Sequence, residues 1–144
     1  MNAAGVLQVP LAVFVWDDGY GISVPKEYQT TKASVSSSLS GMQKTSTTNG
    51  INIYQVKGWD YAGMCEAFEE GIRIAREQHI PVLFHVEELT QPQGHSTSGS
   101  HERYKSAERL EWEKEWDGIR KMKEPRQTFH RASSFSKTAI RKKP

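Results

Sequence analysis

Apolar and polar positions fall into blocks along this chain, and the blocks predict an α/β fold. Residues 11–16 form a continuous apolar run, typical of a strand buried on both faces of a parallel sheet. Residues 51–57 alternate as a strand does, and residues 81–86 form a further apolar strand. The order of these elements favours a mostly parallel sheet with flanking helices. His85, inside the last strand, is interpreted as a hydrogen-bonded histidine rather than a metal ligand.

Two longer helices are expected between and after the strands. Asp60 can cap the first one, which has an apolar stripe on one side and charged residues on the other. The stripe consists of Tyr61, Met64, Cys65, Phe68, Ile72 and Ala75. Residues 107–123 predict the second helix, and residues 1–8 and part of 31–50 predict short ones. The positions expected to be buried on the second helix are Leu110, Trp116 and Ile119.

The distribution of charge divides the chain. The 144 residues suit one modest domain, and the formal net charge is only +2. Residues 120–144 nevertheless hold nine of the 19 Lys and Arg and one of the 17 Asp and Glu. We therefore predict a folded domain over residues 1–123 and a basic, disordered tail over 124–144. Binding of nucleic acid or an acidic partner by the tail is the alternative reading.

Cysteine content and hydropathy limit the cellular setting. Cys65 is the only cysteine, which excludes an internal disulfide and fits a reducing compartment. The sequence has no apolar run of about 18 residues and no secretory leader, so neither a membrane span nor secretion is expected.

An acidic, glycine-rich loop follows the first strand. Residues 14–25 read FVWDDGYGISVP, with Asp17 and Asp18 at the point where the strand ends. Asp-Gly pairs are common in turns, so these acids either are solvated turn residues or bind a cation. A second loop, beginning at Thr90, follows the strand at 81–86. Ligands of parallel sheets bind at the carboxyl ends of strands, where both loops are expected.

The second loop, residues 90–106, reads TQPQGHSTSGSHERYKS. Together the two loops resemble segments of the alpha subunit of thiamine diphosphate-dependent 2-oxo acid dehydrogenases, with the branched-chain enzymes nearest and pyruvate dehydrogenase next. The resemblance extends from residue 1 to about residue 123. It implies a partial thiamine diphosphate-binding fold, in the bacterial cytoplasm or alternatively in the mitochondrial matrix.

The resemblance also implies a cofactor site on the first loop. By this correspondence the side chain of Asp18 and the main-chain carbonyl of Tyr20 bind Mg²⁺, while Gly21 and Ile22 line thiamine diphosphate. Two asparagines of the family correspond here to Asp17 and Asp18. A carboxylate is a sound ligand for Mg²⁺, but it adds negative charge beside a diphosphate, and that charge needs compensation.

On the second loop, His95 matches a histidine that contacts the diphosphate end of the cofactor and assists reductive acylation of a lipoyl group. Ser96 matches a position that is phosphorylated in mitochondrial relatives, where about −2 of charge would be added next to His95. The implied partners are a beta part and a lipoyl-bearing acyltransferase, in an oligomer without nucleic acid.

One half of the family's motif is missing from this sequence. The Gly-Asp-Gly that supplies a further Mg²⁺ ligand does not occur in residues 1–144. We therefore expect weak cofactor binding and no 2-oxo acid decarboxylation by this chain alone. The alternative function is a non-catalytic interaction or regulatory domain that kept the fold and lost the cofactor site.

Overall fold

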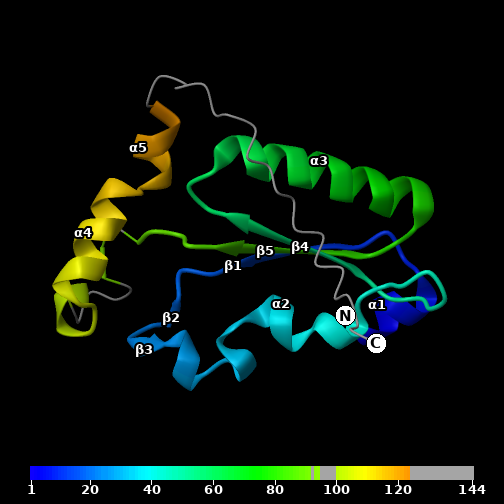
Figure 1. The fold of residues 1–144 in the computed structure, drawn as a ribbon, viewed down its shortest axis with the longest axis horizontal. Helices are drawn as coiled ribbons and strands as arrows, with labels where there is room; N and C mark the ends of the chain where they lie inside the picture. Colours follow the sequence, from blue (N-terminus) through cyan, green and yellow to red (C-terminus); the bar gives the residue numbers. More distant parts are fainter. Residues whose placement is uncertain (92, 95–99, 124–144) are drawn as a thin grey trace, which may run out of the picture.

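Three parallel strands between layers of helix form the centre of the structure, a computed structural model that describes residues 1–91, 93–94 and 100–123 (Figure 1). The strands, in sheet order, are β1 (Ala12–Trp16), β5 (Val82–Glu87) and β4 (Asn52–Lys57). Ala12 of β1 and Asn52 of β4 both pair with Val82. Helix α3 covers one face, and α1 and α2 lie on the other side (Figure 1). The predicted parallel α/β fold is confirmed.

The core lies between β5 and α3 (Tyr61–Gln78). It consists of Ala75, Val82 and Phe84, with Tyr54, Phe68 and Ile72 packed against it. Gly71 allows α3 to approach the sheet closely, since a Cβ there would lie 2.5 Å from Cζ of Phe84 and 3.1 Å from Cε2 of Tyr54. Strand β5 is buried because it is central and covered on both faces.

Helix α3 begins where its sequence predicts, and half of its predicted stripe, Phe68, Ile72 and Ala75, packs in the core. Oδ1 of Asp60 accepts a hydrogen bond from the Gly63 N–H at 3.0 Å, which confirms the predicted cap. The buried residues are Ala67, Gly71 and Ala75. The assignment of Cys65 to the core is therefore wrong: its side chain is exposed. Tyr61, from the same predicted stripe, is also exposed.

Strand β1 corrects a second expectation. It was expected to be buried on both faces, but among the described residues β1 is an edge strand beside β5, and its residues alternate between exposed and half-buried. Phe14 stacks on Phe84 at a centroid distance of 4.9 Å and meets Phe68 edge-on at 5.1 Å. Trp16 remains 59% exposed. An apolar run therefore identified the strand but not its place in the sheet.

Short elements lie on the side of the sheet opposite α3, where α2 contacts β4 and β5 (Figure 1). These are α1 (Asn2–Leu7), the hairpin of β2 (Tyr20–Gly21) and β3 (Val24–Pro25), α2 (Val35–Ser38), and 3-10 turns at Lys26–Tyr28, Thr31–Ala33 and Ser40–Met42. The amide of Gln8 donates to the carbonyls of Gly5 and Gly50, at 2.7 and 2.8 Å, and so ties α1 to the chain before β4.

The predicted helix over 107–123 is two helices, α4 (Ala107–Glu115) and α5 (Gly118–Lys123), preceded by a 3-10 turn at His101–Arg103. The break is at Trp116, whose ring packs on Trp59 at 4.7 Å, and Asp117, which accepts a hydrogen bond from the Arg120 N–H. Ile119 is 64% exposed, so its predicted burial is wrong. No helix in the described part of the chain is long and apolar enough to cross a membrane. The predicted tail at 124–144 lies outside the described residues.

Candidate functional site

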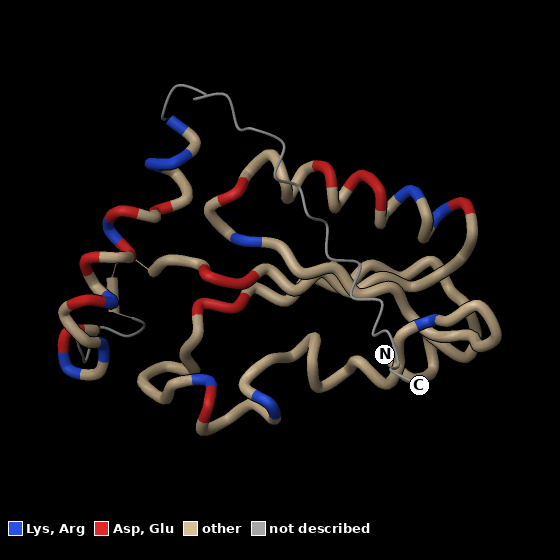
Figure 2. The backbone as a smooth tube through the Cα atoms, viewed as in Figure 1, with Lys and Arg blue, Asp and Glu red and all other residues tan. Residues whose placement is uncertain are grey.

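The acidic loop begins where β1 leaves the sheet. The main-chain N–H of Asp17 still donates to the Val86 carbonyl at 2.8 Å, and the Leu89 N–H donates to the Asp17 carbonyl at 3.3 Å. The carboxyl ends of β1 and β5 therefore stay side by side. Asp17 lies beside residues 86–89, which include Glu87 and Glu88, and Figure 2 shows acidic segments close together at this end of the sheet. The acidic loop after β1 and the loop that begins at Thr90 after β5 therefore start at the same edge of the sheet, as predicted.

Two aspartate side chains shape the turn that follows. Oδ1 of Asp17 accepts a hydrogen bond from the Gly19 N–H at 2.7 Å, and Oδ1 of Asp18 accepts one from the Tyr20 N–H at 3.1 Å. Both are local side-chain bonds of the kind that make Asp a turn former. Gly19 has φ 85°, a left-handed conformation that glycine adopts without strain.

The hairpin brings Asp18 and the Tyr20 carbonyl to the same edge. The Lys26 N–H donates to the Gly19 carbonyl at 2.9 Å, so Gly19 and Lys26 are a hydrogen-bonded pair. The adjacent pair, Tyr20 and Pro25, is then a non-hydrogen-bonded pair, so the N–H and C=O groups of Tyr20 point away from the partner strand. Because the Tyr20 N–H meets the Asp18 carboxylate, the Tyr20 carbonyl points toward that side too. Two oxygen ligands of the kind that Mg²⁺ prefers thus share one edge.

The hairpin tip has a conformation that its sequence does not favour. Ile22 has φ 61°, which is unusual for a β-branched residue. At Gly21, a Cβ would lie 2.2 Å from Oε1 of Gln29, so the Gln29 amide fills the space beside this glycine. Gly21 therefore permits a close approach, and in this structure the approaching group is a side chain of the protein.

A buried polar chain lies behind the turn. Nε2 of His85 is 2.9 Å from Oδ2 of Asp17, and Nδ1 is 2.9 Å from Oγ of Ser36. Ser36 in turn accepts a hydrogen bond from the side-chain amide of Gln55 at 2.7 Å. His85 is completely buried, and Ser36 is 4% exposed. The interpretation of His85 as a hydrogen-bonded histidine is confirmed, and these hydrogen bonds join the loop after β1 to β5, α2 and β4.

The negative charge of Asp17 is compensated by neighbouring donors and by Lys26. Nζ of Lys26 lies 3.4 Å from its Oδ2. Burial alone would raise the pKa of the Asp17 carboxyl. Hydrogen bonds from His85 and the Gly19 N–H, together with the positive charge of Lys26, outweigh burial and hold this pKa below its ordinary value of 3.8. Asp17 is therefore a structural carboxylate, whereas Asp18 presents its side chain at the hairpin edge.

Asp17, His85 and Glu87 offer ligand atoms that all lie within 4.8 Å of one another. Such a grouping is geometrically compatible with a metal ion. Both ring nitrogens of His85 already have hydrogen-bond partners in Asp17 and Ser36, however. The ring is satisfied by the protein itself, and the geometry gives it a structural role.

The end of the second loop and α4 reach the turn from the other side. The Tyr20 ring lies 5.7 Å from the Tyr104 ring, 5.2 Å from Nζ of Lys105 and 5.7 Å from Cζ of Arg109. Nη2 of Arg109 donates to the Asp18 carbonyl at 3.0 Å. Lys105 and Arg109 both pair with the buried Glu113, at 2.8 Å each. The two segments that carry the family resemblance therefore meet around Tyr20.

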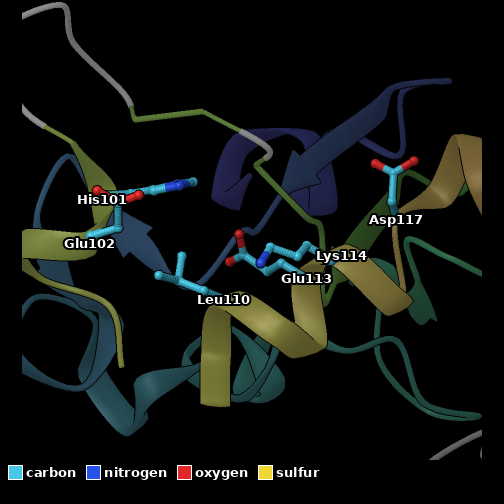
Figure 3. A pocket seen from close by; sticks show the side chains of 6 residues that line it. All are labelled: His101, Glu102, Leu110, Glu113, Lys114 and Asp117. Atoms are coloured by element: carbon cyan, nitrogen blue, oxygen red, sulfur yellow. The ribbon is translucent and has the colours of Figure 1, made fainter. Parts of the chain in front are cut away.

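A cavity of about 170 Å³ adjoins this cluster on the side of α4. The described residues that line it are His101, Glu102, Leu110, Glu113, Lys114 and Asp117 (Figure 3). Glu113 is thus shared between the cavity and the cationic cluster, while Asp18 and Tyr20 lie outside the lining. Three of the six lining side chains are acidic, which does not suit an anionic diphosphate.

Asp18, Tyr20, Gly21 and Ile22 of the predicted site lie on one hairpin, and their predicted contacts with Mg²⁺ and thiamine diphosphate stay predictions. His95 and Ser96 lie outside the described residues, so their predicted roles stay predictions. The residues that the sequence did not reveal are Ser36, Gln55, Lys26, Arg109 and Glu113. The one signal of the buried hydrogen-bond series in the sequence was His85, a polar residue inside an otherwise apolar strand. It did not indicate which residues His85 bonds to.

These features define an α/β protein with a candidate cation site on the loop after a parallel strand. Comparison with known families gives the class: the model of the family "Dehydrogenase E1 component" matches residues 1–139, and the chain belongs to this family. A similar protein is 2-oxoisovalerate dehydrogenase subunit alpha 2, mitochondrial, of Arabidopsis thaliana. It is 30% identical over 113 residues, which are 78% of this chain and 22% of that protein. The chain thus spans about a fifth of its relative's length, and its own cellular compartment stays a prediction.

Proposed function

We propose that this chain is an alpha part of a thiamine diphosphate-dependent 2-oxo acid dehydrogenase and supplies two Mg²⁺ ligands, the Asp18 carboxylate and the Tyr20 carbonyl. The observation that supports this most directly is the hydrogen bond from the Tyr20 N–H to the Asp18 carboxylate, from which the common orientation of the two oxygens at the hairpin edge follows by strand geometry. Both ligands are hard oxygens, as Mg²⁺ requires. Membership of the Dehydrogenase E1 component family supports the same assignment.

The residues around the turn fit an anionic cofactor once a cation is bound. Lys26 lies beside Asp17, and Arg109 lies beside the Asp18 main chain, so positive charge adjoins the two acids. When bound, thiamine diphosphate supplies the carbon nucleophile and electron sink for decarboxylation of a 2-oxo acid. This chain would orient the diphosphate through Mg²⁺, and His95 would contact its diphosphate end and assist acyl transfer to a lipoyl group.

The assembled enzyme would also need a beta part and a lipoyl-bearing acyltransferase. We propose that the isolated chain does not decarboxylate 2-oxoisovalerate, the substrate in its relative's name, because the chain offers only part of the ligand set. Release of carbon dioxide by the purified chain, above the rate of the Asp18→Ala variant, would contradict this part of the proposal.

Thermal unfolding with Mg²⁺ and thiamine diphosphate tests the site itself. Stabilisation that saturates at millimolar ligand is expected for the wild-type chain, since a ligand bound to the folded state stabilises it by mass action. Asp18→Ala should abolish the stabilisation, and Asp18→Asn should retain part of it, because an amide oxygen also binds Mg²⁺. Glu66→Ala, on the exposed side of α3, is the matched control. Equal stabilisation of wild type and Asp18→Ala would refute the assignment.

A non-catalytic interaction domain is the second candidate. The exposed aromatic side chains of the edge strand β1, Phe14 at 37% and Trp16 at 59%, favour it. Edge strands with apolar side chains are suited to pairing with another chain. A wild-type chain that shows no stabilisation by Mg²⁺ and thiamine diphosphate would favour this candidate over the first.

A further inference from the structure

The guanidinium of Arg109 joins α4 to the turn that carries Asp18. Its Nη2 donates to the Asp18 main-chain carbonyl at 3.0 Å, and its Nε donates to Glu113 at 2.8 Å. Asp18 and Glu113 are far apart in sequence, and the planar guanidinium of Arg109 is hydrogen-bonded to both. Because the donors of a guanidinium have fixed relative directions, Arg109 sets the orientation of the Asp18–Gly19 peptide relative to α4.

The same cluster holds the side chain of Tyr20. Cζ of Arg109 lies 5.7 Å from the centre of the Tyr20 ring, and Nζ of Lys105 lies 5.2 Å from it. Both distances are within the range of cation–π attraction. Glu113, which is 4% exposed, fixes both cations. The main chain of Asp18 and the ring of Tyr20 are therefore held by side chains from residues 105–113.

We infer that Arg109 is a positioning residue for the cation site: it fixes the turn so that the Asp18 carboxylate and the Tyr20 carbonyl face one Mg²⁺. This inference rests on the proposed function. Arg109 touches neither oxygen that would bind the metal. It acts through the Asp18 carbonyl and the Tyr20 ring, and it adds positive charge near two adjacent acids.

Arg109 can be changed without leaving an unpaired buried charge. Glu113 keeps the ammonium of Lys105 at 2.8 and 2.9 Å when Arg109 is replaced. Arg109→Met removes the hydrogen bonds but keeps an apolar stem against Trp112, over which the guanidinium lies at 4.8 Å. Arg109→Lys keeps the charge and loses the planar fork. Arg73→Met is the matched control, because Arg73 pairs with Glu70 and Glu77 on the exposed side of α3.

Amide hydrogen exchange of the full chain, without metal, measures the positioning directly. The reporter is the Tyr20 N–H, which donates to Asp18 in the turn. Its exchange should be about tenfold faster in Arg109→Met and in Arg109→Lys, the effect of losing one charge-assisted hydrogen bond. Arg73→Met should leave it unchanged. An unchanged rate in Arg109→Met, a wild-type rate in Arg109→Lys, or an equal increase in Arg73→Met would overturn the inference.

Binding of Mn²⁺ in the presence of thiamine diphosphate, followed by water proton relaxation, is the second readout. The dissociation constant for Mn²⁺ should rise about tenfold in Arg109→Met and stay unchanged in Arg73→Met. Equal affinity of wild type and Arg109→Met would overturn the positioning role while leaving the proposed cation site intact. Absence of Mn²⁺ binding by the wild-type chain would instead overturn the proposed function, and the inference with it.

Discussion

The imidazole of His85 donates a hydrogen bond from Nε2 to Oδ2 of Asp17, at 2.9 Å. The direction follows from the acid, because a carboxylate whose pKa is lowered is ionised near neutral pH and can only accept. Nδ1 of the ring is then an acceptor, because the main-chain N–H of Ser36 also donates to it at 3.4 Å, and it receives the hydroxyl proton of Ser36. The Ser36 oxygen accepts in turn from Gln55. Every member of this chain is satisfied, from β4 to the acidic turn.

Replacing His85 should therefore destabilise the fold. His85→Ala is expected to lower the free energy of unfolding by about 3 kcal/mol, because it leaves a cavity and removes the partner of both Asp17 and Ser36. Urea denaturation measures the change. The control is His79→Asn, at an exposed helix end with φ 56°, which asparagine tolerates; its effect should stay within about 0.5 kcal/mol. Equal effects of the two variants would contradict the assignment.

The lowered pKa of Asp17 predicts a pH dependence of stability. The unfolded chain binds a proton at Asp17 at a higher pH than the folded chain does. Stability from this group is therefore complete above its ordinary pKa of 3.8 and is lost as the pH falls through the lower pKa of the folded state. Unfolding free energies measured from pH 5 downward should fall more steeply for wild type than for Asp17→Asn. Parallel curves would mean that Asp17 does not contribute.

The buried pair of Lys105 and Glu113 should be sensitive to the loss of one partner. Glu113→Gln keeps the shape of the side chain and leaves the buried ammonium of Lys105 without a charged partner, at a cost of about 3 kcal/mol. Glu111→Gln is the matched control on the same helix, since its pair with Lys114 is exposed and should contribute less than about 1 kcal/mol. Chemical denaturation measures the unfolding free energy of both variants. Similar decreases in the two variants would argue against burial of the Lys105–Glu113 pair.

The close contact between α3 and the sheet predicts a strong effect at Gly71. Gly71→Ala would place a methyl group against Phe84 and Tyr54 and should cost about 1–3 kcal/mol in unfolding free energy. Gly41→Ala is the control, because a Cβ at Gly41 would have no neighbour within 4 Å. Thermal unfolding of the two variants is the measurement. A neutral Gly71→Ala variant would mean that α3 lies further from β5.

Local sequence signals determined the elements of this protein and their order. The apolar run at 81–86 became the central strand β5, Asp60 became the cap of α3, and the acids at 17 and 18 lie at a strand end as their position predicted. These features depend on neighbours within a few residues, through hydrogen bonds and side-chain periodicity. The resemblance of two loops to one family was likewise legible in the residues, and the family match agrees with it.

Only the tertiary structure decided which strand is at the edge, which face of α3 is buried and what surrounds the acids. Alternate residues of β1 are exposed because the sheet ends at β1 within the described residues, and Cys65 is exposed because the buried residues of α3 are Ala67, Gly71 and Ala75. The two aspartates acquired different surroundings, since Asp17 points to His85 and Asp18 lies at the hairpin edge. Arg109 meets the Asp18 carbonyl from 91 positions away. Such contacts join segments whose separation along the chain carries no periodic signal, so the folded packing alone specifies them.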